Sequence, residues 1–412
     1  MQKVISESKL SFYLISSALI LFFFSDGLNK YFQYGQFTND DAIENSFSIS
    51  IYLRFVYEIL FLLIILCNLN LVRRKIVLAI IFMILIFCIG QETFLLNYVD
   101  PEYSIFYHFT LLNKYLYVFI VFGGVYKVVE NWKDYGRLIK IYENIIVVNS
   151  ILIFVGVLFS INLFLSYYAQ ENRYGYDGLI PSVNEATLYY FIAISYFYYK
   201  HFIRKEKSWK IYLVIVSSLL IGTKTIYLFL FFLIIYHLIT NLSLAKKIIY
   251  ISATLIVVPL LIIPVILNPS FSFLYASFTY FYEKEGFWFM ITSGRSYYIQ
   301  DKFVENLSHW NVINYFFGGT NQLKYMIEMD FFDLFLFLGI IGSIVLFYMY
   351  YNTIFKNSNK VKFLKFFCFC FFLLAFLSGH MFSSATNALN LVLVVIFIGW
   401  SNYYTNNIEI QG

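Results

Sequence analysis

Apolar runs long enough to cross a lipid bilayer recur along the whole chain, and this pattern constrains the fold more than any other feature. We place such runs at residues 10–29, 47–69, 76–96, 104–127, 141–168, 184–203, 209–222, 224–242, 247–267, 328–353, 363–380 and 384–403. An α-helix of about 20 apolar residues spans a bilayer. The sequence therefore predicts an all-α polytopic membrane protein, with about 12 transmembrane helices in one integral membrane domain covering residues 1–412.

The composition supports this fold class. The chain is 60% hydrophobic and 13% charged, whereas a soluble domain carries about 25% charged residues. The net charge of +5 is spread over short loops between apolar runs, so membrane lipids are expected partners and nucleic acid is not. The histidines are few and scattered, and the cysteines lie inside predicted spans. We therefore expect no metal site and no cofactor.

Basic residues are distributed unevenly between the predicted loops. Lysine and arginine are enriched in cytoplasmic loops of membrane proteins. If the N-terminus is cytoplasmic, every predicted inner loop is basic, as in Arg73-Arg74-Lys75, and the outer segments hold acids such as Asp40 and Asp100. An odd number of spans would spoil this pattern. The sequence thus predicts an even span count and two cytoplasmic termini.

One predicted outer segment is much longer than the other loops. It runs from residue 268 to residue 327, and long ordered loops are usually functional. Between Arg295 and Trp310, apolar residues recur at Ile299, Phe303 and Leu307 with helical spacing. We expect an amphipathic helix here, lying on the outer face of the membrane.

Few cations remain on the outer side once the topology is assigned. Arg173 and Arg295 each lie beside a glycine, and Lys224 lies in the turn Gly-Thr-Lys-Thr. Arginine binds phosphate through bidentate, permanently charged hydrogen bonds. A diphosphate site is one interpretation of these three residues. Solvated loop arginines and a lysine extended toward the headgroups are the alternatives.

A histidine and two carboxylates also lie at predicted outer helix ends. His380 follows Ser-Gly at the end of one span, and Glu328 and Asp330 lie at the start of another. A histidine there can serve as a general base, and the carboxylates can orient the arginines or activate a hydroxyl. The alternatives are a structural hydrogen-bonding histidine and acids favoured by a helix dipole.

Three charged residues fall within or near predicted spans. Arg54 and Glu58 stand four apart, which predicts a local ion pair, and Lys114 lies in the fourth span. Charges inside a membrane are costly and usually face the bundle interior. A role for Arg54 in lining a substrate cavity therefore remains open, and His108 is a possible partner of Lys114 or Glu58.

Several short motifs occur in an ordered set over roughly residues 140–400. They are Arg173-Tyr-Gly-Tyr followed by Pro181-Ser-Val-Asn184-Glu, Gly222-Thr-Lys-Thr225, Ser293-Gly-Arg295 with Trp310 and Phe317-Gly-Gly319, Glu328-x-Asp330-x-x-Asp333 with Gly339-Ile-Ile-Gly342, and Gly379-His380-x-x-x-Ser384. In order and topology, the chain resembles the Wzy-type polysaccharide polymerases of the O-antigen polymerase and ligase superfamily.

The resemblance implies a bundle of the GT-C glycosyltransferase type in a bacterial inner membrane, with its site at the outer face. It implies transfer of a growing chain between undecaprenyl-diphosphate-linked oligosaccharides, without metal or cofactor, and a chain-length regulator and a flippase as partners. An O-antigen ligase and a flippase or other transporter are the alternative functions.

Candidate residues follow from the motifs and the topology together. The expected catalytic residues are Arg173, Arg295, His380, Glu328 and Asp330. The expected substrate-binding residues are Lys224, Asn184, Arg54, Tyr174, Tyr176 and Trp310. In this hypothesis the arginines bind the diphosphate, and His380 or a carboxylate takes the acceptor proton.

Overall fold

The computed structural model of the chain describes residues 2–37, 48–98, 102–167, 175–241, 279–284, 286–356 and 360–409. The described residues are mostly helical and include no β-strand, and Leu165 and Tyr176 form an isolated β-bridge. The chain is therefore an all-α protein in its described part, as the apolar runs predict.

Six helices are long and apolar enough to cross a membrane. They belong to α1 (Gln2–Phe37), α2 (Ile49–Cys67), α3 (Leu71–Asn97), α4 (Ile105–Val125, extended by the 3-10 turn η1, Tyr126–Glu130), α5 (Trp132–Phe159) and α16 (Asp330–Asn352). These helices identify the chain as a membrane protein by their length and composition.

The other apolar helices of the described part are shorter. They are α6 (Val183–Tyr198), continued by the π-helical turn η3 (Tyr199–Ile203), α7 (Lys210–Leu219), α8 (Lys224–Asn241), α17 (Lys362–Leu377) and α18 (Ala385–Glu409, of which Ala385–Trp400 is apolar). The predicted span 247–267 lies outside the described residues, so the count of twelve stays a prediction.

The predicted span at 141–168 is misplaced by nine residues. Helix α5 begins at Trp132, where the Asn131 side chain accepts a hydrogen bond from the Asp134 backbone N–H. It ends at Phe159, because Ser160 adopts left-handed backbone angles (φ 51°) and its N–H bonds back to the Gly156 carbonyl. The polar first turns concealed the helix start, since hydropathy alone marks only the apolar part of a helix.

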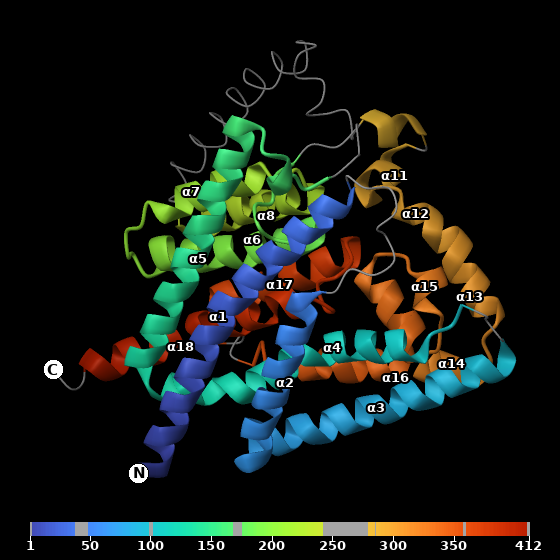
Figure 1. Cartoon of the computed structure of the whole chain (residues 1–412), viewed down its shortest axis with the longest axis horizontal. Helices are drawn as coiled ribbons and strands as arrows, with labels where there is room; N and C mark the ends of the chain where they lie inside the picture. The colour runs from blue at the N-terminus through green and yellow to red at the C-terminus, as the bar shows by residue number, and fades with distance from the viewer. Residues whose placement is uncertain are drawn as a thin grey trace.

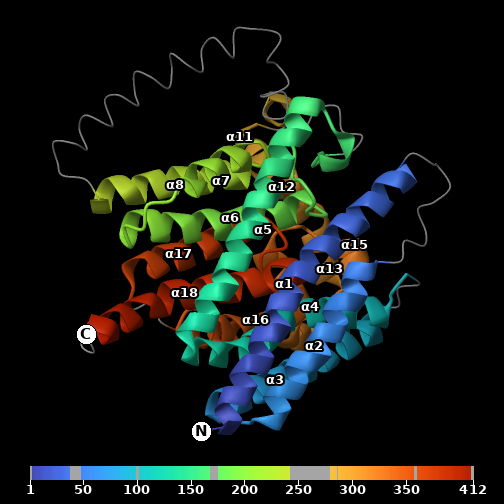
Figure 2. The same cartoon turned by 60° about the vertical axis from the view of Figure 1, so that its left-hand side comes forward.

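Both termini lie at one side of the molecule (Figure 1). Helices α1 and α2 run beside each other, α18 lies against α4 and α6, and α5 lies against α1 and α7. Figure 1 places the segment from α11 (Phe287–Thr292) to α15 (Gln322–Tyr325) on the side of the bundle away from the termini. In the turned view of Figure 2, α13 and α15 lie behind α1.

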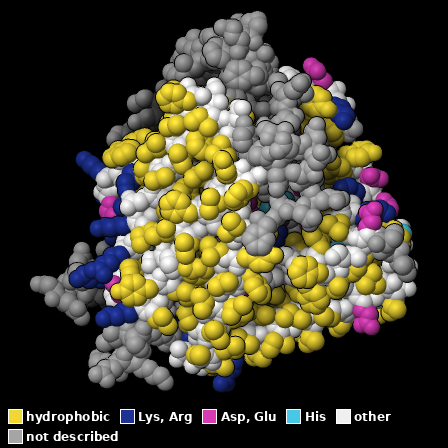
Figure 3. Space-filling view, in the orientation of Figure 1, with side chains coloured by type: hydrophobic (Ala, Val, Ile, Leu, Met, Phe, Trp, Pro, Cys, Tyr) yellow, Lys and Arg dark blue, Asp and Glu magenta, His cyan; other side chains and the backbone are white. Residues whose placement is uncertain are grey.

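Hydrophobic side chains cover most of the face shown in Figure 3. Lysine and arginine gather along its left edge, on the side of the termini, and acidic side chains gather along its right edge. A belt of apolar surface between a basic rim and a more acidic rim is the arrangement that the predicted topology requires.

A short helix packs into the bundle beside a break in α16. Helix α14 (Val312–Phe317) lies against α3 and α16, and α16 is interrupted at Gly339 (φ 65°, ψ −169°). The break frees the Leu336 carbonyl, which accepts a hydrogen bond of 2.9 Å from the Gly319 N–H. A Cβ on Gly339 would lie 2.4 Å from the Gly318 nitrogen, so the two backbones touch because neither residue has a side chain.

The predicted outer segment contains one helical stretch from Arg295 to Ser308, called here the outer helical stretch. It consists of α12 (Arg295–Tyr298), the π-helical turn η5 (Ile299–Phe303) and α13 (Val304–Ser308). Its apolar residues and Trp310 pack on Ile327, Met329 and Leu336. The apolar face of the amphipathic helix is thus turned toward protein, because the loop folds back and supplies its own core.

Candidate functional site

Arg295 and Glu328 form an ion pair at the end of the bundle away from the termini. The Arg295 Nη2 lies 3.2 Å from Glu328 Oε2, and its Nε lies 3.4 Å from the same oxygen. The Arg295 side chain is 16% exposed and that of Glu328 is 47% exposed. Because one carboxylate oxygen takes both contacts and solvent reaches the pair, the guanidinium remains available to a second anion.

Asp330, the first residue of α16, binds the turn between α17 and α18. Its carboxylate accepts backbone N–H bonds from His380 (2.6 Å), Met381 (2.6 Å) and Phe382 (2.9 Å). Charge-assisted bonds of this kind are the strong ones. Both oxygens are occupied, so Asp330 is suited to position this turn and not to exchange a proton with a substrate.

The backbone at the site adopts unusual angles. Ser293 (φ 55°), Glu328 (φ 62°) and His380 (φ 72°) are three of the five non-glycine residues with positive φ in the described part of the chain. Such conformations are costly and persist where the surrounding structure holds them, often at functional sites. Here the Asp330 carboxylate holds His380 in this conformation.

The His380 imidazole lies in a charged setting. The side chain is half-buried, and its charge interacts with Glu328, Lys114 and Arg295. Burial lowers the pKa of His380 below its usual value, Glu328 opposes this shift, and Lys114 and Arg295 add to it. The imidazole is therefore neutral at pH 7, the form that accepts a proton. The structure thus brings together Arg295, Glu328, Asp330 and His380, which the sequence places in four separate motifs.

Lys224 and Trp310 are fastened to neighbouring segments. The Lys224 Nζ donates to the Met290 carbonyl (2.6 Å) and lies 4.6 Å from the centre of the Phe281 ring. It thereby links the start of α8 to α11, five residues before Arg295. The Trp310 Nε1 donates to the Gly319 carbonyl (2.7 Å), which ties the outer helical stretch to the loop beside α16.

Three further candidate residues belong to the segment before α6, and a fourth lies in the first turn of this helix. Arg173 and Tyr174 lie outside the described residues. Tyr176 is buried in the core, its N–H donates to the Leu220 carbonyl (2.8 Å), and its ring packs beside Gly156. Asn184 is half-buried in the first turn of α6.

The spacing of Arg54 and Glu58 predicts an ion pair between them, and this prediction is wrong: the partner of Arg54 is Asp26. Its Nη2 binds both oxygens of Asp26 on α1, at 2.7 and 2.6 Å, and its Nη1 binds the Ser50 hydroxyl. Glu58 instead accepts a hydrogen bond of 2.7 Å from the Asn113 side chain. The tertiary partner is favoured because α1 and α2 pack together and leave Asp26 buried, where it needs a cation.

Glu185, in the first turn of α6, lies close to this ion pair and was not predicted as a site residue. It accepts hydrogen bonds from the Ser384 hydroxyl and from the Asn387 amide (2.7 Å), and its charge interacts with Arg54. Sequence reasoning passes over it because an acid in a first helical turn has an ordinary explanation in the helix dipole.

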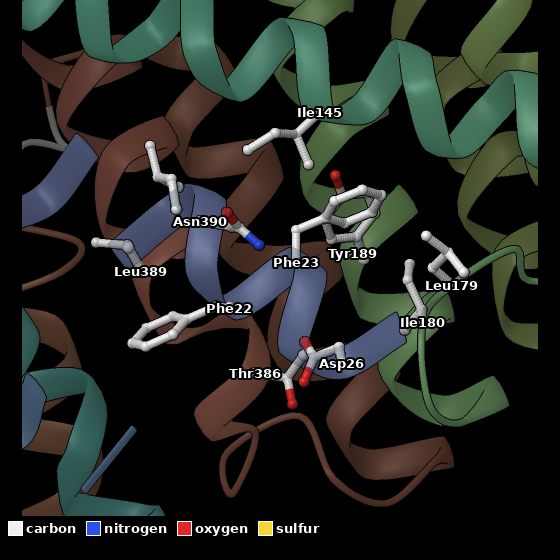
Figure 4. Close-up of a pocket in the computed structure, with 11 residues that line it drawn as sticks. Phe22, Phe23, Asp26, Ile145, Leu179, Ile180, Tyr189, Thr386, Leu389 and Asn390 are labelled. Carbon is white, nitrogen blue, oxygen red and sulfur yellow. The ribbon is translucent and has the colours of Figure 1, made fainter. Parts of the chain in front are cut away.

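A cavity of ≈ 30 Å³ lies beside Asp26. Tyr189, Thr386 and Asn390 also line it, among apolar residues of α1, α5 and α18 (Figure 4). This volume holds about one water molecule. The cavity is therefore too small for a sugar ring or a diphosphate.

Both ring nitrogens of His108 contact backbone groups and not charged side chains. Its Nε2 accepts the Gln322 backbone N–H (3.0 Å), and its Nδ1 lies 2.6 Å from the Ser104 carbonyl. This pair of contacts requires a neutral ring with the proton on Nδ1. The predicted pairing with Lys114 or Glu58 is wrong, because the loop before α15 folds down onto α4.

Within the described ranges, no group of three or more histidine, cysteine, aspartate or glutamate side chains is arranged to hold a metal ion. Comparison with known proteins adds no family: no family model, no curated protein and no solved structure matches the chain. The class that the fold defines is an all-α membrane protein, and its function is argued from the site alone.

Proposed function

We propose that the protein is a polysaccharide polymerase of the Wzy type, with a GT-C-like bundle of about twelve spans in a bacterial inner membrane. It moves a growing chain from undecaprenyl diphosphate to the next lipid-linked oligosaccharide. The residues around Arg295 carry the reaction at the outer face, and both termini are cytoplasmic. A chain-length regulator and a flippase are its proposed partners.

One observation carries the proposal: a neutral histidine, an accessible arginine and a carboxylate meet at one end of the bundle. Arg295 is available to an anionic leaving group, since its contacts with Glu328 leave donors unused. His380 is held in place by Asp330 and is neutral at pH 7. Transfer from a lipid diphosphate needs these two functions, a cation for the departing diphosphate and a base for the acceptor hydroxyl.

The roles follow from these contacts. Arg295 binds the diphosphate and stabilises the charge that develops on it, and Arg173 and Lys224 add to the positive field. His380 accepts the proton of the acceptor hydroxyl. Glu328 orients Arg295, and Asp330 positions the turn that carries His380. The outer helical stretch, which packs on Ile327 and Met329, limits the access of water to the site and so limits hydrolysis.

A transporter of lipid-linked oligosaccharides is the second candidate. The buried pairs Arg54–Asp26 and Lys30–Asp177 favour it, because charges deep in several helices are typical of transport pathways. Each of these pairs is satisfied within the protein, however, whereas solvent reaches Arg295 and Glu328 beside His380. An O-antigen ligase would use the same leaving group and differs in its acceptor.

Deletion of the gene and complementation with variants test the proposal. We expect the deletion strain to make only single capped repeats, wild type to restore long polymer, and Arg295→Ala to fail at an equal protein level. The exposed Lys365→Ala is the matched control and should restore polymer. Long lipid-linked polymer in the deletion strain would indicate a ligase instead, and repeats retained on the inner leaflet would indicate a transporter.

A further inference from the structure

A groove with a volume of ≈ 410 Å³ lies where helices α3 and α4 pack side by side (Figure 1). Its walls are mostly apolar and include Phe87 of α3 and Ile105 and Phe109 of α4. Two polar residues of α3, Gln91 and Glu92, also line it. Sites for small molecules are typically clefts of about 300–1,000 Å³ with apolar walls and a few placed polar groups. The groove has the size and the lining of such a site.

The groove opens on a face of the protein that a membrane covers. Helix α3 is long and apolar enough to cross a membrane. Beside the opening, Leu96 is 80% exposed, Ile105 is 48% exposed and Phe109 is 43% exposed. An exposed apolar surface of this kind meets acyl chains or another protein, not water. The occupant of the groove therefore comes from the bilayer.

The Gln91 amide has a donor that the protein does not use. Gln91 is 2% exposed, and its Oε1 accepts hydrogen bonds from the Tyr103 hydroxyl (3.1 Å) and the Thr320 backbone N–H (3.4 Å). Its Nε2 has no hydrogen-bond partner within the described part of the chain. A buried donor without an acceptor is costly, so an oxygen atom of a bound molecule would stabilise it.

Glu92 supplies a negative charge beside this donor. Its side chain is exposed, and among the residues that the structure describes it forms no ion pair. A cationic group of a bound molecule would complement this carboxylate. The groove thus offers apolar walls, one hydrogen-bond donor and one negative charge. A phospholipid with an ammonium headgroup matches all three, through its acyl chain, its ester or phosphate oxygens and its ammonium group.

We propose that this groove is a binding site for one phospholipid whose headgroup carries an ammonium group, as in phosphatidylethanolamine. An acyl chain lies along the apolar walls, a lipid oxygen accepts a hydrogen bond from Gln91 Nε2, and the ammonium group pairs with Glu92. The inference is independent of the proposed function, because it uses none of the residues assigned to the transfer reaction.

Photo-crosslinking of the full-length protein in nanodiscs of phosphatidylglycerol tests the site. The probes are phosphatidylethanolamine and phosphatidylglycerol, each carrying the same diazirine on an acyl chain, and mass spectrometry maps the labelled peptides. Cys88→Phe fills the groove, because Cys88 lines it. Cys67→Phe is the matched control, since Cys67 is also an exposed free cysteine but is the last residue of α2. Size-exclusion chromatography and thermal unfolding verify that each variant is folded.

We expect the phosphatidylethanolamine probe to label α3 and α4 of wild type up to about fivefold more than the phosphatidylglycerol probe, the effect of one exposed charge pair. Cys88→Phe should reduce this labelling to the level seen on the exposed face of α2, and Cys67→Phe should leave it unchanged. Glu92→Gln should remove the preference between the probes. Because Glu92 is exposed, this variant keeps the test available if Cys88→Phe does not fold.

Three results would overturn the inference. Equal labelling of wild type by both probes would show that the groove does not recognise the ammonium group. Undiminished labelling of folded Cys88→Phe would place the lipid outside the groove. A dimer of wild type that Cys88→Phe dissociates would mean that a second copy of the chain, and not a lipid, covers the groove.

Discussion

The backbone N–H of His380 donates a hydrogen bond of 2.6 Å to Asp330 Oδ1, across 50 residues of sequence. The bond joins the first residue of α16 to the turn before α18, and His380 is held there in a left-handed conformation. The acid thereby sets where the imidazole lies relative to Arg295 and Glu328. Asp330 is thus a positioning residue.

Asp330→Asn should damage both stability and activity. An asparagine offers one acceptor oxygen to three N–H donors and turns its own NH₂ toward them. Hydrogen bonds to charged groups contribute about 1.5–3 kcal/mol each, so we expect the free energy of unfolding to fall by about 3 kcal/mol. Chemical denaturation and a polymer assay measure the two effects. Asp301→Asn, at an exposed acid of the outer helical stretch, is the control. Normal polymer from Asp330→Asn would contradict the positioning role.

The pH dependence should show the lowered pKa of His380. A base must be neutral to accept a proton, so activity is full above the pKa of the folded protein and declines as the pH falls through it. Burial places this pKa below the usual 6.5.

We expect the rate of the wild-type enzyme to fall with pH below 6.5. The residual activity of His380→Gln should not show this fall. Glu328→Gln should move the fall to lower pH, because the Glu328 charge raises this pKa. A fall that stays at the same pH in Glu328→Gln would exclude His380 as the titrating group.

The lowered pKa of His380 should also make the folded protein less stable at low pH. Between the folded and unfolded pKa values of His380, the unfolded chain binds more protons. The free energy of unfolding therefore decreases as the pH falls through this window. Thermal unfolding of wild type and His380→Gln at several pH values tests this. The stability advantage of wild type over His380→Gln should become smaller at low pH. A constant difference would mean that His380 has the same pKa in both states.

The sequence was sufficient to predict an all-α membrane protein and the proximity of several candidate residues. Apolar runs predict membrane-spanning helices because the bilayer imposes a length and a polarity on each of them. The predicted topology places Arg295, Glu328, Asp330 and His380 on one side, and in the structure Arg295 pairs with Glu328 and Asp330 binds the His380 N–H. Their predicted location at helix ends on one side made this grouping predictable without knowledge of the packing.

The partners of the buried charges could not be predicted in the same way. Local spacing favours Arg54–Glu58, but Asp26 is the partner because α1 packs on α2. Which face of α4 carries Lys114 also depends on the packing of its neighbours. Long-range contacts of this kind leave no periodic signal in one sequence, so side-chain pairing was the part that only the structure supplied.

The Arg54–Asp26 pair should behave as a coupled unit. Removing one partner leaves an uncompensated buried charge, which costs about 3–5 kcal/mol. We therefore expect Arg54→Met and Asp26→Asn each to lower stability strongly, and the double variant to be less destabilised than the sum of both. Chemical denaturation of wild type, the two single variants and the double variant gives the coupling energy.

Arg137→Met is the control. It removes an exposed pair with Asp134 and should lower the free energy of unfolding by at most about 1 kcal/mol. Additive effects at Arg54 and Asp26 would show that each contributes independently.

Gly339→Ala tests the break in α16. An alanine Cβ would lie 2.4 Å from the Gly318 nitrogen and 2.5 Å from the Phe316 carbonyl oxygen, and the backbone has a φ of 65°. Since both contacts are with backbone atoms, no side chain can move to make room, and we expect loss of folded protein or of polymer activity.

Gly136→Ala is the matched control, because a Cβ there meets nothing within 4 Å. In helix α5 it should raise stability by about 0.5–1 kcal/mol. Size-exclusion chromatography and thermal unfolding distinguish the two variants. A stable, active Gly339→Ala protein would mean that α14 and α16 do not require this close backbone contact.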